Sequence, residues 1–254
     1  MELKILGCSG GVGDSLRTTT LLIDSDILID AGTGLGDLNL ESMASIRHIF
    51  LTHSHLDHIT SIPFLVDTIF DKINEPIVVH ALEETISALR THIFNNVIWP
   101  DFTRLPNAEN PVVKFQVMQA GETIEINQRK IEMIEVNHTV AAVGYRIESD
   151  SGSFAFSGDS TTNDTFWQAL NNHPALDLLM VESAFSNKDI DLCRIAKHYC
   201  AELLGTDIAK LKLNPQVYIS HSKPGSEEKI FAECEKAIST HSIHKLSSGQ
   251  TFTI

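Results

Sequence analysis

The stretch Leu51-Thr52-His53-Ser54-His55-Leu56-Asp57-His58 places four metal-binding side chains within six consecutive positions. It follows Ile46–Thr52, a run rich in apolar residues that favours a β-strand. In a tight turn after a strand, His53 and His55 can face one metal ion while Asp57 and His58 face a second. Imidazole and carboxylate groups are the ligands expected for zinc, manganese or iron. The stretch therefore predicts a metal site rather than a solvated polar loop.

One cluster cannot complete the coordination of two ions, so we expect further ligands at the ends of other strands. Three candidates, His138, Asp159 and His221, each come just after an apolar run that favours a strand. Open α/β sheets usually build their sites beyond the carboxyl ends of their strands. A single histidine at such a place is more often an ordinary loop residue. The prediction rests on the whole series.

The rest of the chain alternates short apolar runs with segments of helical periodicity. The runs end in Gly, Asn, Asp or Ser, which is typical of strands. Expected strands are Leu3–Leu6, Thr20–Ile23, Ile27–Asp30, Ile46–Thr52, Ile77–His80, Val112–Met118, Ile131–Asn137, Val143–Ile147, Ser153–Ser157, Leu176–Glu182 and Gln216–Ser220. Helical spacing predicts helices over Leu82–Phe94, Leu192–Leu211 and Ser226–Ser239. No linker or repeat interrupts this pattern, so we expect one α/β domain over residues 1–254, with two sheets covered by helices.

Composition limits the partners of the protein. The formal net charge is −14, which repels polyphosphates, so a long nucleic acid is not expected to be the main partner. The four cysteines form no C-x-x-C pair, and we expect free thiols in a reducing compartment. The first residues do not resemble a signal peptide, and no apolar run reaches the roughly 18 residues of a membrane span. These features predict a cytoplasmic protein without a membrane partner.

The ligand series resembles that of the metallo-β-lactamase superfamily, and the resemblance spans nearly the whole chain. Leu28–Gly32 is similar to the Asp-x-Gly turn that supports the metal loop in that superfamily. The resemblance implies an αββα sandwich with the site at one edge. It also implies two divalent ions, most simply Zn²⁺, with Mn²⁺ or iron as alternatives. One ion would be held by His53, His55 and His138, the other by Asp57, His58 and His221, with Asp159 as the bridge.

Two more residues resemble the phosphodiesterase branches of this superfamily, ribonuclease Z among them. Glu182 ends an expected strand, and His198 lies where we expect the following helix to open. By this resemblance His198 would protonate the departing oxygen, and Glu182 would orient it and keep its pKa high. The alternative is a surface acid and an ordinary histidine at a helix N-terminus. With Asp57, these two are the candidate catalytic residues.

The segment Thr91–Phe102 is similar to the class II 3′,5′-cyclic-nucleotide phosphodiesterases. The resemblance implies hydrolysis of cyclic AMP or cyclic GMP to the 5′-monophosphate. Pro63 and Phe64 depart from the aliphatic pair usual in that family, which leaves the substrate preference open. Candidate substrate contacts are Phe94 and Trp99, for which core packing is the more ordinary interpretation, and Lys223, which follows the last ligand motif.

Three other functions stay open from the sequence. A ribonuclease Z-like tRNA 3′-endonuclease would share the metals and the Glu182–His198 pair. It should carry a basic, Gly-rich arm, which we do not find. Hydrolysis of another small phosphodiester or a sulfate ester is the second alternative, and a non-catalytic metal-binding regulator is the third. A homodimer is possible, because dimers are common among soluble proteins.

Overall fold

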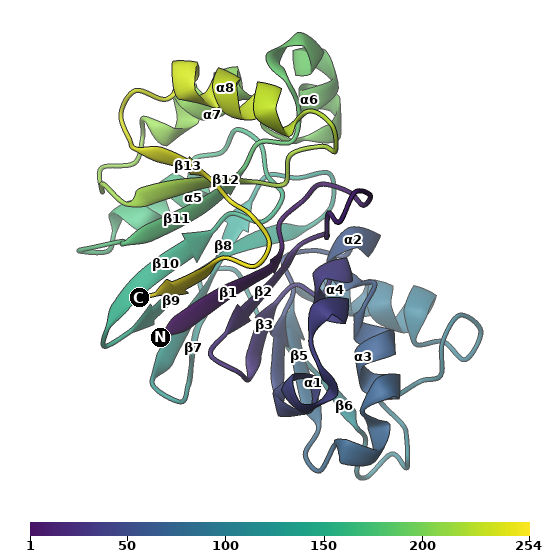
Figure 1. Cartoon of the computed structure of the whole chain (residues 1–254). Coiled ribbons are helices and arrows are strands. Elements are labelled where there is room, and N and C mark those ends of the chain that lie inside the picture. Colours follow the sequence, from purple (N-terminus) through teal and green to yellow (C-terminus); the bar gives the residue numbers. More distant parts are fainter.

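The computed structural model describes residues 1–254, and its strands form two seven-stranded sheets (Figure 1). The first sheet has the order β14 (Thr251–Thr253), β1 (Glu2–Gly7), β2 (Thr20–Ile23), β3 (Ile27–Ile29), β4 (His48–Phe50), β5 (Ile77–Ala81), β6 (Val113–Val117). The second has the order β13 (Ile243–Lys245), β12 (Gln216–Ser220), β11 (Leu178–Glu182), β10 (Gly152–Phe156), β9 (Ala142–Ser149), β8 (Arg129–Val136), β7 (Thr123–Ile126). Each sheet is antiparallel at one end and parallel at the other.

Helices lie on the outer side of each sheet, as Figure 1 shows. The first half of the chain contributes α1 (Leu40–Ser45), α2 (Leu56–Ile59), α3 (Ile62–Thr68) and α4 (Glu83–Ala88), which continues into a π-helical turn, Leu89–Ile93. The second half contributes α5 (Thr165–Asn171), α6 (Ile190–Ala196), α7 (Ala201–Ile208) and α8 (Glu227–Ala237). Short 3₁₀ turns cover Thr33–Asp37, Phe70–Lys72 and Asn187–Asp189. The predicted αββα sandwich is therefore confirmed.

The side chains of β11 show why its sequence is an unbroken apolar run. Leu178 and Met180 belong to the core between the sheets, whereas Leu179 and Val181 belong to the core under the outer helices. Successive residues of a strand point to opposite faces, so a strand covered on both sides needs apolar residues at every position. Each such buried side chain contributes about 1.5–3 kcal/mol. The covered parallel strands are therefore the ones that sequence patterning finds most easily.

The expected helix Leu192–Leu211 is wrong as a single element. The structure ends α6 at Ala196 and begins α7 at Ala201. Between them Lys197 adopts the left-handed conformation, with φ 51° and ψ 52°. The break places His198 between the helices rather than at a helix start. Contacts with distant loops, described below, hold this turn, and helical periodicity contains no signal of them.

Three short strands, β7, β13 and β14, were not expected. Their residues are half-buried or exposed, and none of them contains an apolar run. They extend the sheets at the edges, where only one neighbouring strand is available. β14 pairs with β1 and brings the two ends of the chain together: the Met1 amino group donates to the Ile254 carbonyl at 3.0 Å. None of the helices combines the length and apolar character needed to cross a membrane, and all four cysteines are free.

Candidate metal centre

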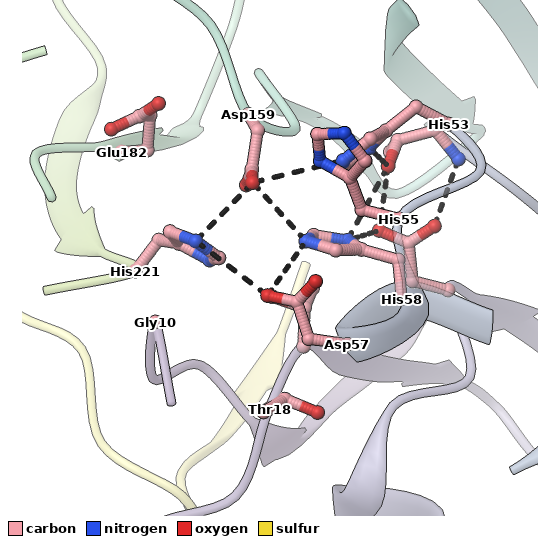
Figure 2. A network of polar contacts seen from close by, with 12 residues as sticks. Gly10, Thr18, His53, His55, Asp57, His58, Asp159, Glu182 and His221 are labelled. Carbon is pink, nitrogen blue, oxygen red and sulfur yellow. Dashed lines mark hydrogen bonds and ion pairs between the residues drawn. The ribbon is translucent and has the colours of Figure 1, made fainter. Parts of the chain in front are cut away.

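The loops at one edge of the two sheets bring all seven candidate ligands together. Figure 2 labels all of them except His138. The loop after β4 and the short helix α2 supply four of them, and the loops after β8, β10 and β12 supply one each. These side chains are His53, His55, Asp57 and His58, then His138, Asp159 and His221. Residues up to 168 positions apart in the sequence thus converge, since strands β4, β8, β10 and β12 all end at this edge.

The ligand atoms form two groups that share one carboxylate. One group is His53, His55, His138 and Asp159, and the other is Asp57, His58, Asp159 and His221; within each group the atoms lie within 4.8 Å of one another. Figure 2 shows Asp159 between the histidines. Its Oδ2 atom lies 3.2 Å from His221 Nε2, 3.3 Å from His58 Nε2 and 3.8 Å from His53 Nε2. The arrangement suits two neighbouring ions with a bridging carboxylate.

Several buried ligand atoms have no hydrogen-bond partner within the protein. They are the Nε2 atoms of His53 and His58, both ring nitrogens of His221, and the Oδ1 atom of Asp159. An unsatisfied polar atom costs roughly 1–3 kcal/mol when buried, so five in one place are costly unless another group binds them. Nitrogen and carboxylate donors around one space fit divalent transition metals. The donor set therefore fits a pair of metal ions, without specifying which metal.

Three of the buried histidines are neutral and can therefore donate a lone pair to a metal ion. Burial lowers the pKa of His138 to about 4, lowers that of His221 to about 3, and lowers that of His53 well below its usual value. These rings are therefore neutral near pH 7, the form that binds metals. His58 differs: burial opposes its charge, but the nearby carboxylates of Asp159 and Asp30 outweigh burial and raise its pKa well above the usual value. A metal ion bound at His58 would displace its proton.

Asp30 supports the metal loop from behind, at the turn after β3. Its Oδ2 accepts a hydrogen bond from His58 Nδ1 at 2.7 Å, and its carboxylate also accepts from the Thr52 backbone N–H and hydroxyl, both at 2.8 Å. These bonds turn His58 Nε2 toward Asp159. Gly32 approaches the same loop so closely that a Cβ atom there would lie 2.3 Å from the Asp57 carbonyl oxygen. Both features match the Asp-x-Gly turn expected from the sequence.

His221 is held by the loop after β1, which the sequence analysis did not include. Its backbone is left-handed, with φ 58°, and its N–H donates to the Cys8 carbonyl at 2.7 Å. A Cβ atom on Gly10 would lie 2.5 Å from the His221 carbonyl oxygen. The glycine pair Gly10-Gly11 was the available signal of this close approach.

Glu182 and His198 form a hydrogen-bonded pair beside the metal groups. His198 Nδ1 lies 2.7 Å from Glu182 Oε1, and both side chains lie within 4.8 Å of Asp159 in ligand-atom distance. Burial raises the pKa of Glu182. Burial also opposes a charge on His198, but the Glu182 carboxylate outweighs it and raises the pKa of His198. The pair can therefore hold a proton on His198 at higher pH than a free imidazole would.

The three candidate substrate contacts lie in different surroundings. Phe94 is only 3% exposed and packs against Phe102, which favours the core interpretation. Trp99 is half-buried and lies edge-on to Phe64, with ring centroids 5.2 Å apart. The Lys223 ammonium donates to the Gly10 carbonyl at 2.9 Å, next to the loop that holds His221.

Comparison with known proteins identifies a matching family and solved structures with a similar fold. Residues 25–238 match the family model described as the beta-lactamase superfamily domain. The unliganded structure of yeast PDE1 superimposes with a TM-score of 0.82 and 17% identity, covering 98% of both chains. At this identity the likeness concerns the fold alone.

Two relatives with similar sequences are named for different activities. A probable 3′,5′-cyclic-nucleotide phosphodiesterase from Yersinia pestis is 25% identical over 89% of this chain and 79% of its own length. A ribonuclease Z from Haloarcula marismortui is 29% identical over 59% of this chain. The matched region spans only 48% of that ribonuclease, about half its length.

Proposed function

The chain belongs to the beta-lactamase superfamily, of metal-dependent hydrolases, and on this premise we propose that it hydrolyses 3′,5′-cyclic nucleotides to 5′-monophosphates. Hydrolysis of a phosphodiester is supported by the Glu182–His198 pair, at hydrogen-bond distance from each other and beside the shared carboxylate of Asp159. The choice of a cyclic nucleotide is supported by the match to the Yersinia phosphodiesterase over 89% of this chain. A hydrolase acting on a diester needs an acid at this place, because the leaving alkoxide must be protonated.

In this proposal each of the two groups of ligands would hold one divalent ion, and Asp159 belongs to both groups. When bound, such ions lower the pKa of a water molecule and offset the negative charge that builds on the phosphate. Asp57 is partly exposed, whereas the other members of its group are buried. Asp57 would therefore complete the second ion site on its solvent-exposed side, and there its carboxylate could face a substrate phosphate.

His198 supplies the proton in the step that breaks the ester bond. Its Nδ1–H donates to Glu182, which leaves Nε2 as the atom that carries and gives up the second proton. A hydroxide ion derived from water forms the new bond to phosphorus while the bond from phosphorus to the ribose 3′-oxygen breaks. The His198 proton goes to that 3′-oxygen, and the phosphate stays on the 5′-oxygen. Before the transfer, the Glu182 carboxylate stabilises the charged imidazolium form of His198. Lys223 and Trp99 are the proposed contacts with the phosphate and the base, respectively.

The relatives also support a second candidate, a ribonuclease Z-like endonuclease, because the Haloarcula match is as prominent as the phosphodiesterase match. The net charge of −14 disfavours it, since a protein that grips tRNA must offset many phosphates. The match to the phosphodiesterase also extends over more of this chain. We therefore favour a small cyclic diester over tRNA as the substrate.

The experiment is product analysis with matched variants. Metal-loaded protein is incubated with cyclic AMP, and the products of wild type, His198→Gln and His173→Gln are separated by chromatography. His173 is the control because it forms a similar 2.7 Å pair with Glu132 outside the metal groups. We expect 5′-AMP from wild type and from the control, and at least a 100-fold slower rate from His198→Gln. Formation of 3′-AMP instead would contradict the assigned direction of cleavage, and cleavage of a precursor tRNA alone would favour the ribonuclease.

A further inference from the structure

The turn between α6 and α7 adopts an unfavourable backbone conformation at a residue that is not glycine. Lys197 is left-handed, and its N–H donates to the Cys193 carbonyl, which ends α6. The left-handed conformation costs a residue with a Cβ atom roughly 1–2 kcal/mol. Helices commonly end with such a turn, but on glycine or asparagine. Other contacts must therefore offset the cost at Lys197.

Two hydrogen bonds join Lys197 to His138, 59 residues earlier in the sequence. The Lys197 carbonyl lies 2.9 Å from His138 Nδ1, and the Lys197 ammonium donates to the His138 carbonyl, also at 2.9 Å. The two bonds run in opposite directions between the same pair of residues. They hold the loop after β8 against the turn.

The first of these bonds determines the tautomer of the His138 imidazole ring. With a carbonyl as its partner, Nδ1 must carry the hydrogen, so Nε2 keeps its lone pair. His138 Nε2 lies 3.2 Å from His55 Nδ1, inside the first group of ligand atoms. The Lys197 carbonyl therefore orients a nitrogen of the first metal site.

The same turn determines where His198 points. Directly after Lys197, His198 directs Nδ1 to Glu182, and its carbonyl accepts a hydrogen bond from the Thr161 hydroxyl at 3.1 Å. Thr161 lies two residues after Asp159, in the loop of the shared carboxylate. The turn is thus tied to the loops of two metal-binding residues, and a helix continuing through Lys197 would lose all of these contacts.

From these contacts we infer that Lys197 is a positioning residue, whose left-handed turn sets His138 for the first metal ion and His198 for proton transfer at once. The inference rests on the proposed metal site and acid. Lys197 need not touch the substrate. Its effect passes through His138 and His198.

The test measures metal affinity without substrate, by Zn²⁺ competition with a chromophoric chelator, in Lys197→Val, Lys197→Gly, Lys197→Met and Lys197→Arg. The control is Lys188→Met, an exposed lysine in the preceding turn. We expect Lys197→Val, which disfavours the left-handed turn, to bind one Zn²⁺ about 10–100-fold more weakly. Lys197→Arg should retain affinity, because it can still donate to the His138 carbonyl. Lys197→Gly should bind more tightly than Lys197→Met, because only glycine adopts the turn without cost once the ammonium is lost.

Thermal unfolding of the metal-free variants and kcat with KM for cyclic AMP complete the test. A positioning role predicts a lower kcat in Lys197→Val with little change in KM. Wild-type zinc affinity in both Lys197→Val and Lys197→Met would overturn the inference. If Lys197→Val does not fold, equal affinities of the Met, Gly and wild-type proteins would do the same. Zinc affinity needs no turnover, so a wild-type protein inactive on cyclic AMP would contradict the proposed function without affecting this result.

Discussion

Replacing Glu182 with glutamine removes one charge from a fully buried carboxylate without changing its shape. Oε1 accepts hydrogen bonds from Ser160 N–H at 2.8 Å and from His198 Nδ1 at 2.7 Å. Oε2 accepts from the N–H groups of Ala184 and Tyr199, at 3.1 and 3.3 Å. All four partners are donors. A glutamine amide must turn its NH₂ group toward two of them.

With the glutamine NH₂ group toward Ala184 and Tyr199, two backbone N–H donors lose their acceptor. In the other orientation the Ser160 N–H loses its acceptor, and His198 Nδ1 can accept only if the ring moves its hydrogen to Nε2. Each donor left facing another donor costs roughly 1–3 kcal/mol of stability. The larger effect is on proton transfer, because the carboxylate that raises the pKa of His198 is gone. A positioned acid contributes about 10²–10⁴ in rate, or about 3–5 kcal/mol. We therefore expect kcat for cyclic AMP to fall by about that factor, with two metal ions still bound.

The pH profile separates this explanation from general damage. The acid must be protonated, so activity falls as pH rises through the pKa of His198. Since Glu182 raises that pKa, Glu182→Gln should lose activity at lower pH than wild type does. Glu132→Gln, which breaks the pair with His173, serves as the control and should leave the profile unchanged. An unshifted alkaline limb in Glu182→Gln, or a wild-type rate, would refute the role given to the pair.

Asp30→Asn should weaken binding of one metal ion about 10–100-fold, measured by chelator competition, because His58 loses the carboxylate that orients it. Gly32→Ala should lower both metal affinity and melting temperature, because the new Cβ atom meets the Asp57 carbonyl oxygen at 2.3 Å. Leu179→Ala should reduce the free energy of unfolding by about 2–5 kcal/mol in urea titrations while the metal content stays constant. Removal of metal by a chelator should abolish turnover and lower the melting temperature, because the buried ligand atoms lose their partners; an unchanged melting temperature would argue that the ions do not bind there.

The sequence predicts structure most reliably where a short pattern along the chain reflects a single physical requirement. His53 to His58 are adjacent along the chain, and a strand such as β11 must be apolar at every position because both faces are covered. Asp30 and Gly32 were similarly found from a short turn motif. In each case the information lies within a few residues, so a reading along the chain recovers it.

Some features that depend on distant contacts were not predicted. The left-handed turn at Lys197 is held by His138 and Thr161, so helical periodicity over 192–211 indicates one continuous helix. The role of the Cys8–Gly10 loop in holding His221 depends on a contact across more than 200 residues. The environment of Phe94 was ambiguous for the same reason: an aromatic residue near a metal loop can face the core or a ligand, and only packing decides.

The most direct test of the central claim is a metal titration followed by turnover. Metal-free protein receives Zn²⁺ or Mn²⁺ in steps, and the rate of 5′-AMP formation from cyclic AMP is plotted against the metal bound per chain. We expect 5′-AMP as the product, with most of the rate appearing as the second ion binds. Two ions bound per chain with no hydrolysis of cyclic AMP or cyclic GMP would contradict the proposed substrate, and full activity with one ion would contradict the two-ion site.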